Sequence, residues 1–135
     1  MIARELQSYR KTYELVKMVV EAAKEYNKQF KYTLGSKTID EALLLFEYIQ
    51  RANMFKENRA MYLNGFIVKF ETVKTFLRLA DDFKQLSNNR KVKMFECMED
   101  IGRQITAWKR SPVKNGGLQR EPAIRNGEPG ESFQR

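Results

Sequence analysis

The chain has 135 residues, and its 25 lysines and arginines outnumber 17 acidic residues, which gives a net charge of +8 at neutral pH. It contains no histidine and one cysteine, Cys97. These absences exclude a serine or cysteine nucleophile activated by histidine, a zinc site of cysteine and histidine, and a disulfide within the chain. With 42% hydrophobic and 31% charged residues the composition is that of a globular chain, and it favours a basic binding protein over an enzyme.

The sequence predicts a cytoplasmic protein that does not enter a membrane. Residues 1–6 lack the apolar core and the small-residue cleavage site of a secretory signal. The longest apolar runs, such as 43–46, are far shorter than the roughly 20 residues that span a bilayer. One cysteine suits a reducing compartment, and its place beside Met98 in a helical pattern predicts that Cys97 is a small buried hydrophobe.

Four stretches repeat apolar residues at steps of three and four, which is the spacing of one helix face. We expect helices over about 8–27, 37–53, 57–86 and 89–109. The expected inward residues are, in chain order, Leu6, Tyr9, Tyr13, Val16, Val20 and Ala23; Ile39, Ala42, Leu43, Phe46 and Ile49; Leu63, Phe66, Phe70, Val73, Leu77 and Ala80; and Met94, Met98, Ile101, Ile105 and Trp108.

Local chemistry marks several helix ends. Gly35 suits a left-handed residue that ends the first helix or lies in the turn after it, and Ser36 can cap the second helix. Ser87 or Asn88 can cap the fourth. Gly65 and Gly102 lie inside helices, where each costs about 1 kcal/mol relative to alanine, so we expect neighbouring helices to approach them closely.

The expected fold is all-α: an antiparallel up-down four-helix bundle over residues 1–110, followed by a flexible tail over 111–135. All three prolines lie in this tail, together with four of the seven glycines. The tail has too few apolar residues to offset the entropy of ordering it, and its net charge is only +1. The basic character therefore belongs to the folded body.

No residue is predicted to be catalytic, and no cofactor or metal site is expected. The acidic residues of the last helix pair with its own cations, no glycine-rich phosphate loop follows a strand, and the inward positions are apolar. The basic residues form either a solvated face or an anion-binding face, with nucleic acid as the main candidate ligand. The candidate binding residues on the third and fourth helices are Lys69, Lys74, Arg78, Arg90, Lys91, Lys93, Arg103, Lys109 and Arg110.

The second and third helices have more apolar residues than one inward stripe requires. The surplus residues are Leu44, Leu45, Tyr48, Ile67, Val68, Phe76, Leu79 and Phe83. Exposed apolar patches usually mark interfaces, so we expect a homo-oligomer or a stable complex with a partner.

Three segments resemble a known family. Residues 34–39 are similar to the turn into the second helix of small four-helix-bundle proteins. This group includes proteins encoded in ribosomal-RNA intervening sequences and the accessory variability determinant proteins of diversity-generating retroelements. Residues 76–80 and 101–109 resemble the second branch, above all the pair Gly102-Arg103 followed by Trp108. The resemblance covers about residues 8–110.

This resemblance implies a homopentameric barrel that is not an enzyme. Members of the family bind RNA and DNA and associate with the reverse transcriptase of the retroelement. Together they act on template-repeat RNA in mutagenic retrohoming. Arg78 and Arg103 match arginines of the family motifs, whereas Gly102 and Trp108 look structural.

Two other functions remain open at this stage. The chain could be a protein-interaction bundle of the intervening-sequence type, whose basic surface serves only solubility. An enzyme that uses carboxylates alone is disfavoured by the missing histidine and the apolar inward face.

Overall fold

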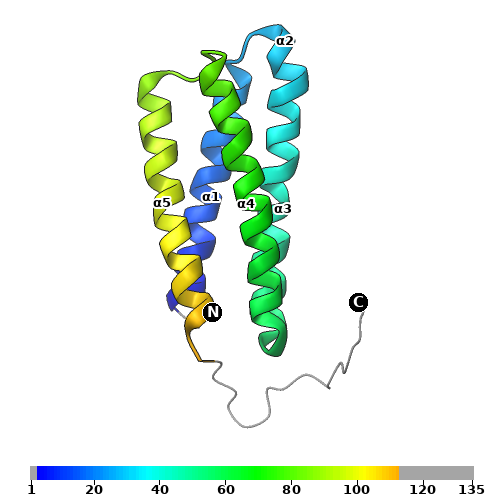
Figure 1. The fold of residues 1–135 in the computed structure, drawn as a ribbon, viewed down its shortest axis with the longest axis vertical. Coiled ribbons are helices and arrows are strands. Elements are labelled where there is room, and N and C mark those ends of the chain that lie inside the picture. Colours follow the sequence, from blue (N-terminus) through cyan, green and yellow to red (C-terminus); the bar gives the residue numbers. More distant parts are fainter. Residues whose placement is uncertain (1–2, 113–135) are drawn as a thin grey trace.

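The structure is a computed structural model that describes residues 3–112, with side chains from residue 5 onward, and over these residues it is all-helical. Four long helices alternate in direction: α1 (Ala3–Lys24), α3 (Ser36–Met54), α4 (Arg59–Asp82) and α5 (Asn88–Arg110). They form an antiparallel four-helix bundle, as predicted (Figure 1). The expected tail begins at residue 111, and everything after residue 112 lies outside the described residues.

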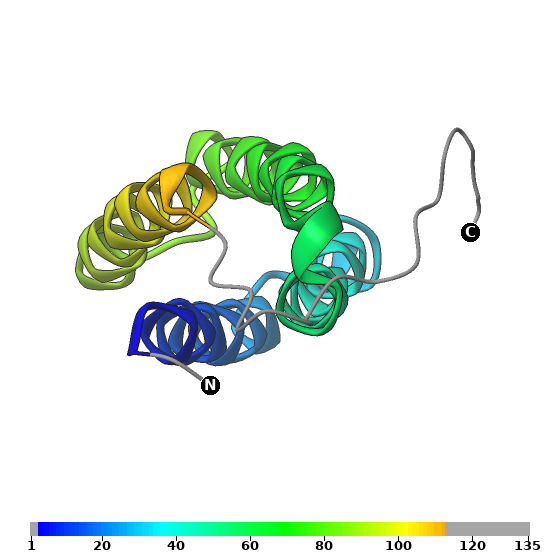
Figure 2. The ribbon, with the colours of Figure 1, turned by 90° about the horizontal axis from the view of Figure 1, so that it is seen from below.

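The four helices surround one core, as the view along the bundle shows (Figure 2). The inward residues predicted for α4 and α5 are confirmed, since all of them are at least 96% buried. Cys97 is also buried, as expected, and its thiol donates to the Lys11 carbonyl at 3.4 Å. A regular seam of apolar residues on these two helices therefore sufficed to identify their buried faces.

The predicted inward face of α1 is correct in part: Val16 and Ala23 are buried and Tyr9 and Val20 pack half-buried against the core, but the prediction is wrong for Leu6 and Tyr13. Leu6 and Tyr13 are 39% and 50% exposed, and the core side instead begins with Ser8 and Thr12 and continues through Leu15. Periodicity alone did not place Leu6 and Tyr13 correctly, because the buried face of α1 is the one that contacts both α3 and α5. Neither the Ser8 nor the Thr12 hydroxyl finds a hydrogen-bond partner among the described residues.

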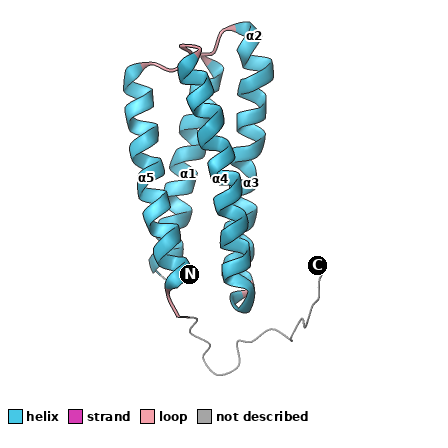
Figure 3. Ribbon diagram, in the orientation of Figure 1, coloured by secondary structure: helices cyan, strands magenta, loops and turns pink. Residues whose placement is uncertain are grey.

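The second predicted helix, about 37–53, is confirmed as α3, but the sequence missed a helical stretch directly before it. A short α2 (Lys28–Phe30) runs into a π-helical turn, Lys31–Gly35, and then into α3 (Figure 3). Gly35 has an ordinary right-handed φ of −61°, and Ser36 makes no side-chain cap. The prediction that Gly35 ends a helix is therefore wrong: its role is close packing, because a Cβ there would lie 3.3 Å from Tyr26 Cδ2.

The register of α3 also differs from the prediction at two leucines. Leu43, expected inside, is 49% exposed, whereas Leu45, expected among the surplus apolar residues, is fully buried. Leu44, Val68, Leu79 and Phe83 are at least 36% exposed, which confirms that these surplus apolar residues lie outside the core. Helix α5 begins with Ser87 as its cap, whose hydroxyl accepts from the Arg90 amide at 3.2 Å.

Candidate nucleic-acid interface

Helices α4 and α5 are the most loosely packed of the four neighbouring pairs, and a groove of about 690 Å³ lies between them. Lys74 and Arg78 line it from α4, and Arg103 lines it from α5. The structure thus brings three of the nine predicted binding residues to one groove. The antiparallel helices place Lys74 and Arg78, in the second half of α4, beside the first half of α5, whereas Arg103 lies farther along the same groove, in the second half of α5.

The floor of this groove is apolar. Phe66 and Phe70 of α4 and Met98 and Ile105 of α5 line it, and all four are nearly fully buried. Gly102 also lines it, and a Cβ there would meet no described atom within 4 Å outside the adjoining backbone of α5. The expectation that a neighbouring helix of this chain packs on Gly102 is therefore wrong, and the groove leaves room for something from outside the chain.

The α4 rim of the groove has two cations, Lys74 and Arg78, and one carboxylate, Glu71. The Lys74 ammonium pairs with Glu71 at 3.1 Å and lies 5.3 Å from the centre of the Phe70 ring. Arg78 is exposed and has no ion pair among the described residues, so it can give its full charge to an anion. Across the groove, α5 contributes Glu96 and Glu99. An anion would therefore bind on the α4 side, next to Arg78.

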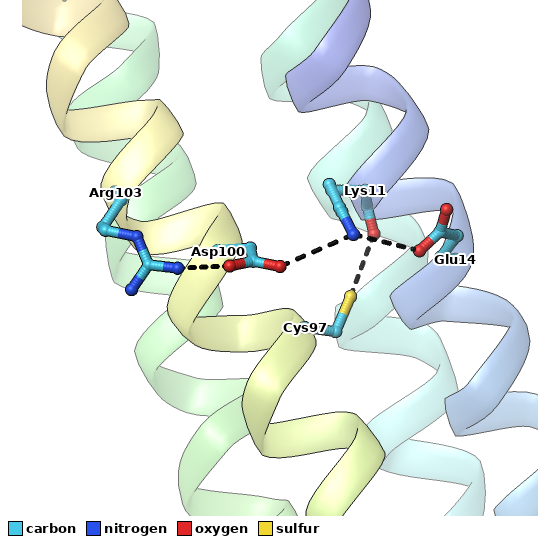
Figure 4. A network of polar contacts seen from close by, with 5 residues as sticks. All are labelled: Lys11, Glu14, Cys97, Asp100 and Arg103. Carbon is cyan, nitrogen blue, oxygen red and sulfur yellow. Dashed lines mark hydrogen bonds and ion pairs between the residues drawn. The ribbon is translucent and has the colours of Figure 1, made fainter.

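Arg103 belongs to a polar network that joins α5 to α1 (Figure 4). Its guanidinium pairs with Asp100, and Asp100 also meets the Lys11 ammonium at 3.5 Å. Lys11 in turn lies 3.6 Å from Glu14, whose charge is the main reason that the pKa of Lys11 is raised. The two cations and two carboxylates of this network neutralise each other. Arg103 therefore attracts an anion less strongly than its exposed position suggests.

The remaining six predicted residues do not gather at the groove. Lys69 faces α3, where it donates to Glu41 at 2.9 Å, and this hydrogen bond raises the pKa of Lys69. Lys91 pairs with Asp81 at 3.4 Å and so connects α5 to α4. The other four lie along α5: Arg90 and Lys93 near its start, and Lys109 and Arg110 at its end, about 24 to 30 Å away along the helix axis.

Sequence reasoning missed a set of lysines at one end of the bundle. Lys28, Lys31 and Lys37 lie within ten residues that contain no acid, and Lys84 follows the end of α4. None of the four has an ion pair within residues 5–112. The acid-free stretch 28–37 was a usable signal, but only the fold brings Lys84 to the same end.

Two further findings limit the chemistry of the described part of the chain. Within residues 3–112, no group of three or more cysteine, aspartate or glutamate residues could hold a metal ion. No helix in that range is both long enough and apolar enough to cross a bilayer.

A comparison with family models gives one match: the model described as bAvd-like covers residues 6–112. This range includes all four long helices and both rims of the groove. No curated protein and no solved structure is significantly similar to the chain.

Proposed function

The chain belongs to the bAvd-like family, the accessory variability determinant type of diversity-generating retroelements, and from this premise we propose that it is a non-catalytic accessory subunit of such an element. In this role it is a basic, cytoplasmic oligomer that binds RNA and DNA and the reverse transcriptase of the retroelement. It thereby supports mutagenic cDNA synthesis and retrohoming. The family match is the observation that carries the proposal.

The charge of the body supports the nucleic-acid part of this proposal. The body, residues 1–110, has a net charge of +7 that attracts polyanions from a distance, and Lys74 and Arg78 place two cations on one rim of an open groove. Lysine and arginine bind phosphates by releasing condensed counterions, and this mode of binding depends weakly on sequence and strongly on salt.

Exposed apolar residues support self-assembly, and the resemblance points to a pentamer. On the α1–α3 side, Leu6, Tyr13 and Leu43 are 39%, 50% and 49% exposed. The ring of Tyr13 lies 6.1 Å from that of Phe46, so this apolar surface is continuous between the two helices. Gly102 gives a second place where another chain can approach the backbone closely.

Nucleic-acid binding is tested by measuring affinity for RNA and DNA against salt concentration. We expect tight binding in dilute buffer that weakens steeply as salt rises. The double variant Lys74→Ala/Arg78→Ala should bind more weakly than Arg10→Ala/Lys17→Ala, a control that removes the same charge from exposed positions of α1. Equal loss in both variants would show that only net charge matters and would remove the groove from the interface.

The partner and the assembly need separate measurements. Affinity purification with the neighbouring reverse transcriptase should recover a complex, and sedimentation should give a mass of several copies of the chain. A lone monomer that binds no polyanion at low salt would contradict the proposal.

One observation favours the alternative of a protein-interaction module without a nucleic-acid role. Four of the nine predicted cations already have carboxylate partners: Lys69, Lys74, Lys91 and Arg103. Under this alternative the protein still forms complexes, but it binds neither RNA nor DNA in dilute buffer.

A further inference from the structure

A second hollow, of about 650 Å³, lies at the end of the bundle where α2 and the π-helical turn meet the end of α4. Its apolar lining comes from Phe30, Tyr32 and Leu34 on one side and from Leu79 and Phe83 on the other. Phe30 and Phe83 stack with ring centres 5.1 Å apart, so the two sides share one aromatic surface. This hollow is separate from the α4–α5 groove, because no residue lines both.

The aromatic side chains here face solvent to an unusual degree. Tyr32 is 68% exposed and Phe83 is 53% exposed, whereas most aromatic residues of the bundle are buried or half-buried. An exposed ring gains little from the core, so neither ring is explained by the stability of the bundle. Tyr32 lies in the π-helical turn, a conformation that is often found at functional sites.

Unpaired lysines surround these rings. The Lys31 ammonium lies 5.9 Å from the centre of the Tyr32 ring, and Lys37 lines the hollow itself. Lys28 and Lys84 flank the hollow along the chain, next to α2 and after Phe83. Because none of these four lysines has an ion pair among the side chains of residues 5–112, their charges remain available to an anionic ligand.

We propose that this hollow binds single-stranded nucleic acid, with unpaired bases stacked on Tyr32 and Phe83 and the adjacent phosphates held by the lysines. Flat rings flanked by ammonium groups match the alternation of base and phosphate along a single strand. The one carboxylate that lines the hollow, Asp40, can accept a hydrogen bond from a base amino group. The inference rests on the proposed nucleic-acid function and adds to it a preference for unpaired nucleotides.

A duplex does not fit this site in the same way, because its bases are stacked on one another and their faces are covered. A duplex can use only the lysines. The hollow should therefore distinguish single strands from duplexes, whereas cations on α4 and α5 should bind both through phosphates.

The test uses the full chain and two fluorescent probes. One probe is a single RNA strand of about 12 nucleotides, a length within the range that one such site covers, and the other is a duplex that contains the same strand. We expect Tyr32→Ala to weaken single-strand binding about 10-fold and duplex binding less than about 2-fold. Tyr32→Phe keeps the ring and should bind like the wild type, whereas Tyr32→Leu keeps an apolar side chain without a π face and should behave like Tyr32→Ala. Val68→Ala, on an exposed side of α4, is the matched control.

The lysines and the stacking contact each have a separate readout. The double variant Lys31→Gln/Lys37→Gln should make the salt dependence of single-strand binding shallower, by about 0.7 in log–log slope for each lost phosphate contact. A strand carrying 5-iodouridine should crosslink under light to Tyr32 or Phe83, because photocrosslinking requires stacking contact.

The outcomes separate this inference from the proposed function. If the wild type binds both probes and Tyr32→Ala changes neither affinity, or if the crosslinks map only to α4–α5 groove residues, the stacking site is overturned and the proposed function stands. If Tyr32→Ala weakens both probes equally, the preference for unpaired bases is overturned. If the wild type binds neither probe in dilute buffer, the proposed function fails as well, and an acidic protein partner becomes the better occupant of the hollow.

Discussion

The ring of Tyr48 on α3 packs directly against the backbone of Gly65 on α4. A Cβ at position 65 would lie 2.8 Å from Tyr48 Cδ1 and closer still to Cε1. This contact confirms the prediction that a neighbouring helix approaches Gly65, and it explains why a glycine is kept inside a long helix.

Gly65→Ala is therefore expected to destabilise the bundle. The gain in helix propensity is about 1 kcal/mol, and forcing a methyl group into a filled site costs about 1–3 kcal/mol, so we expect a net loss of about 1 kcal/mol. Urea unfolding measures this loss. The double variant Gly65→Ala/Tyr48→Leu should recover part of it, and a single variant as stable as the wild type would contradict the packing shown.

Gly102→Ala should have the opposite effect. Apart from its chain neighbours and the backbone of its own helix, no atom of the described residues lies within 4 Å of the added Cβ, so only the helix propensity changes, and stability should rise by about 1 kcal/mol. Unfolding of an oligomer depends on concentration, so both proteins are compared at the same concentration. If Gly102 lies at a contact between copies of the chain, the variant should also sediment as a smaller species. A variant that is less stable than the wild type, with unchanged assembly, would contradict the prediction that only helix propensity changes at this position.

Lys84 is strained, because its φ of 61° is in the left-handed region. It ends α4 in a Schellman-type turn, in which the Gln85 amide donates to the Ala80 carbonyl at 2.8 Å. We expect Lys84→Gly to raise the free energy of unfolding by about 1 kcal/mol and to weaken nucleic-acid binding by removing a charge.

Lys84→Ala separates the two effects. It removes the same charge but keeps the left-handed strain, so its affinity should match that of Lys84→Gly while its stability stays near the wild-type value. If Lys84→Gly is no more stable than Lys84→Ala, the strain at this position does not affect folding.

The bundle should lose stability at alkaline pH because two buried acids resist ionisation. Burial raises the pKa of the Cys97 thiol from 9.0 to about 11 and that of the Tyr26 phenol from 10.0 to about 12. At a pH between the unfolded and folded pKa values of either group, the unfolded chain binds fewer protons than the folded chain. The stabilisation is therefore complete below about pH 9 and falls as the pH rises toward 12.

Urea unfolding at about pH 8 and about pH 11 measures this loss. Cys97→Ala and Tyr26→Phe should each reduce the difference between the two pH values, since each removes one titrating group. A variant that keeps the full wild-type difference would show that its group does not contribute.

Much of the fold could be predicted from local sequence, because α4 and α5 each carry a continuous apolar seam, to which α4 adds exposed apolar residues such as Val68 and Leu79. A seam with steps of three and four lies on one side of a helix, so the spacing of Phe66, Phe70, Met98 and Ile105 identified their sides of the core. The overall basic charge followed in the same way from composition, which is independent of the fold.

Only the tertiary structure decided which face of α1 is buried and which cations are free. In α1, contact with α3 and α5 places Thr12 and Leu15 in the core and leaves Tyr13 exposed, although the apolar spacing favoured Tyr13. Whether a lysine is paired depends on carboxylates far away in sequence, as with Lys69 and Glu41, which are 28 residues apart. Periodicity reports on one helix at a time, whereas burial and ion pairing are properties of several helices together.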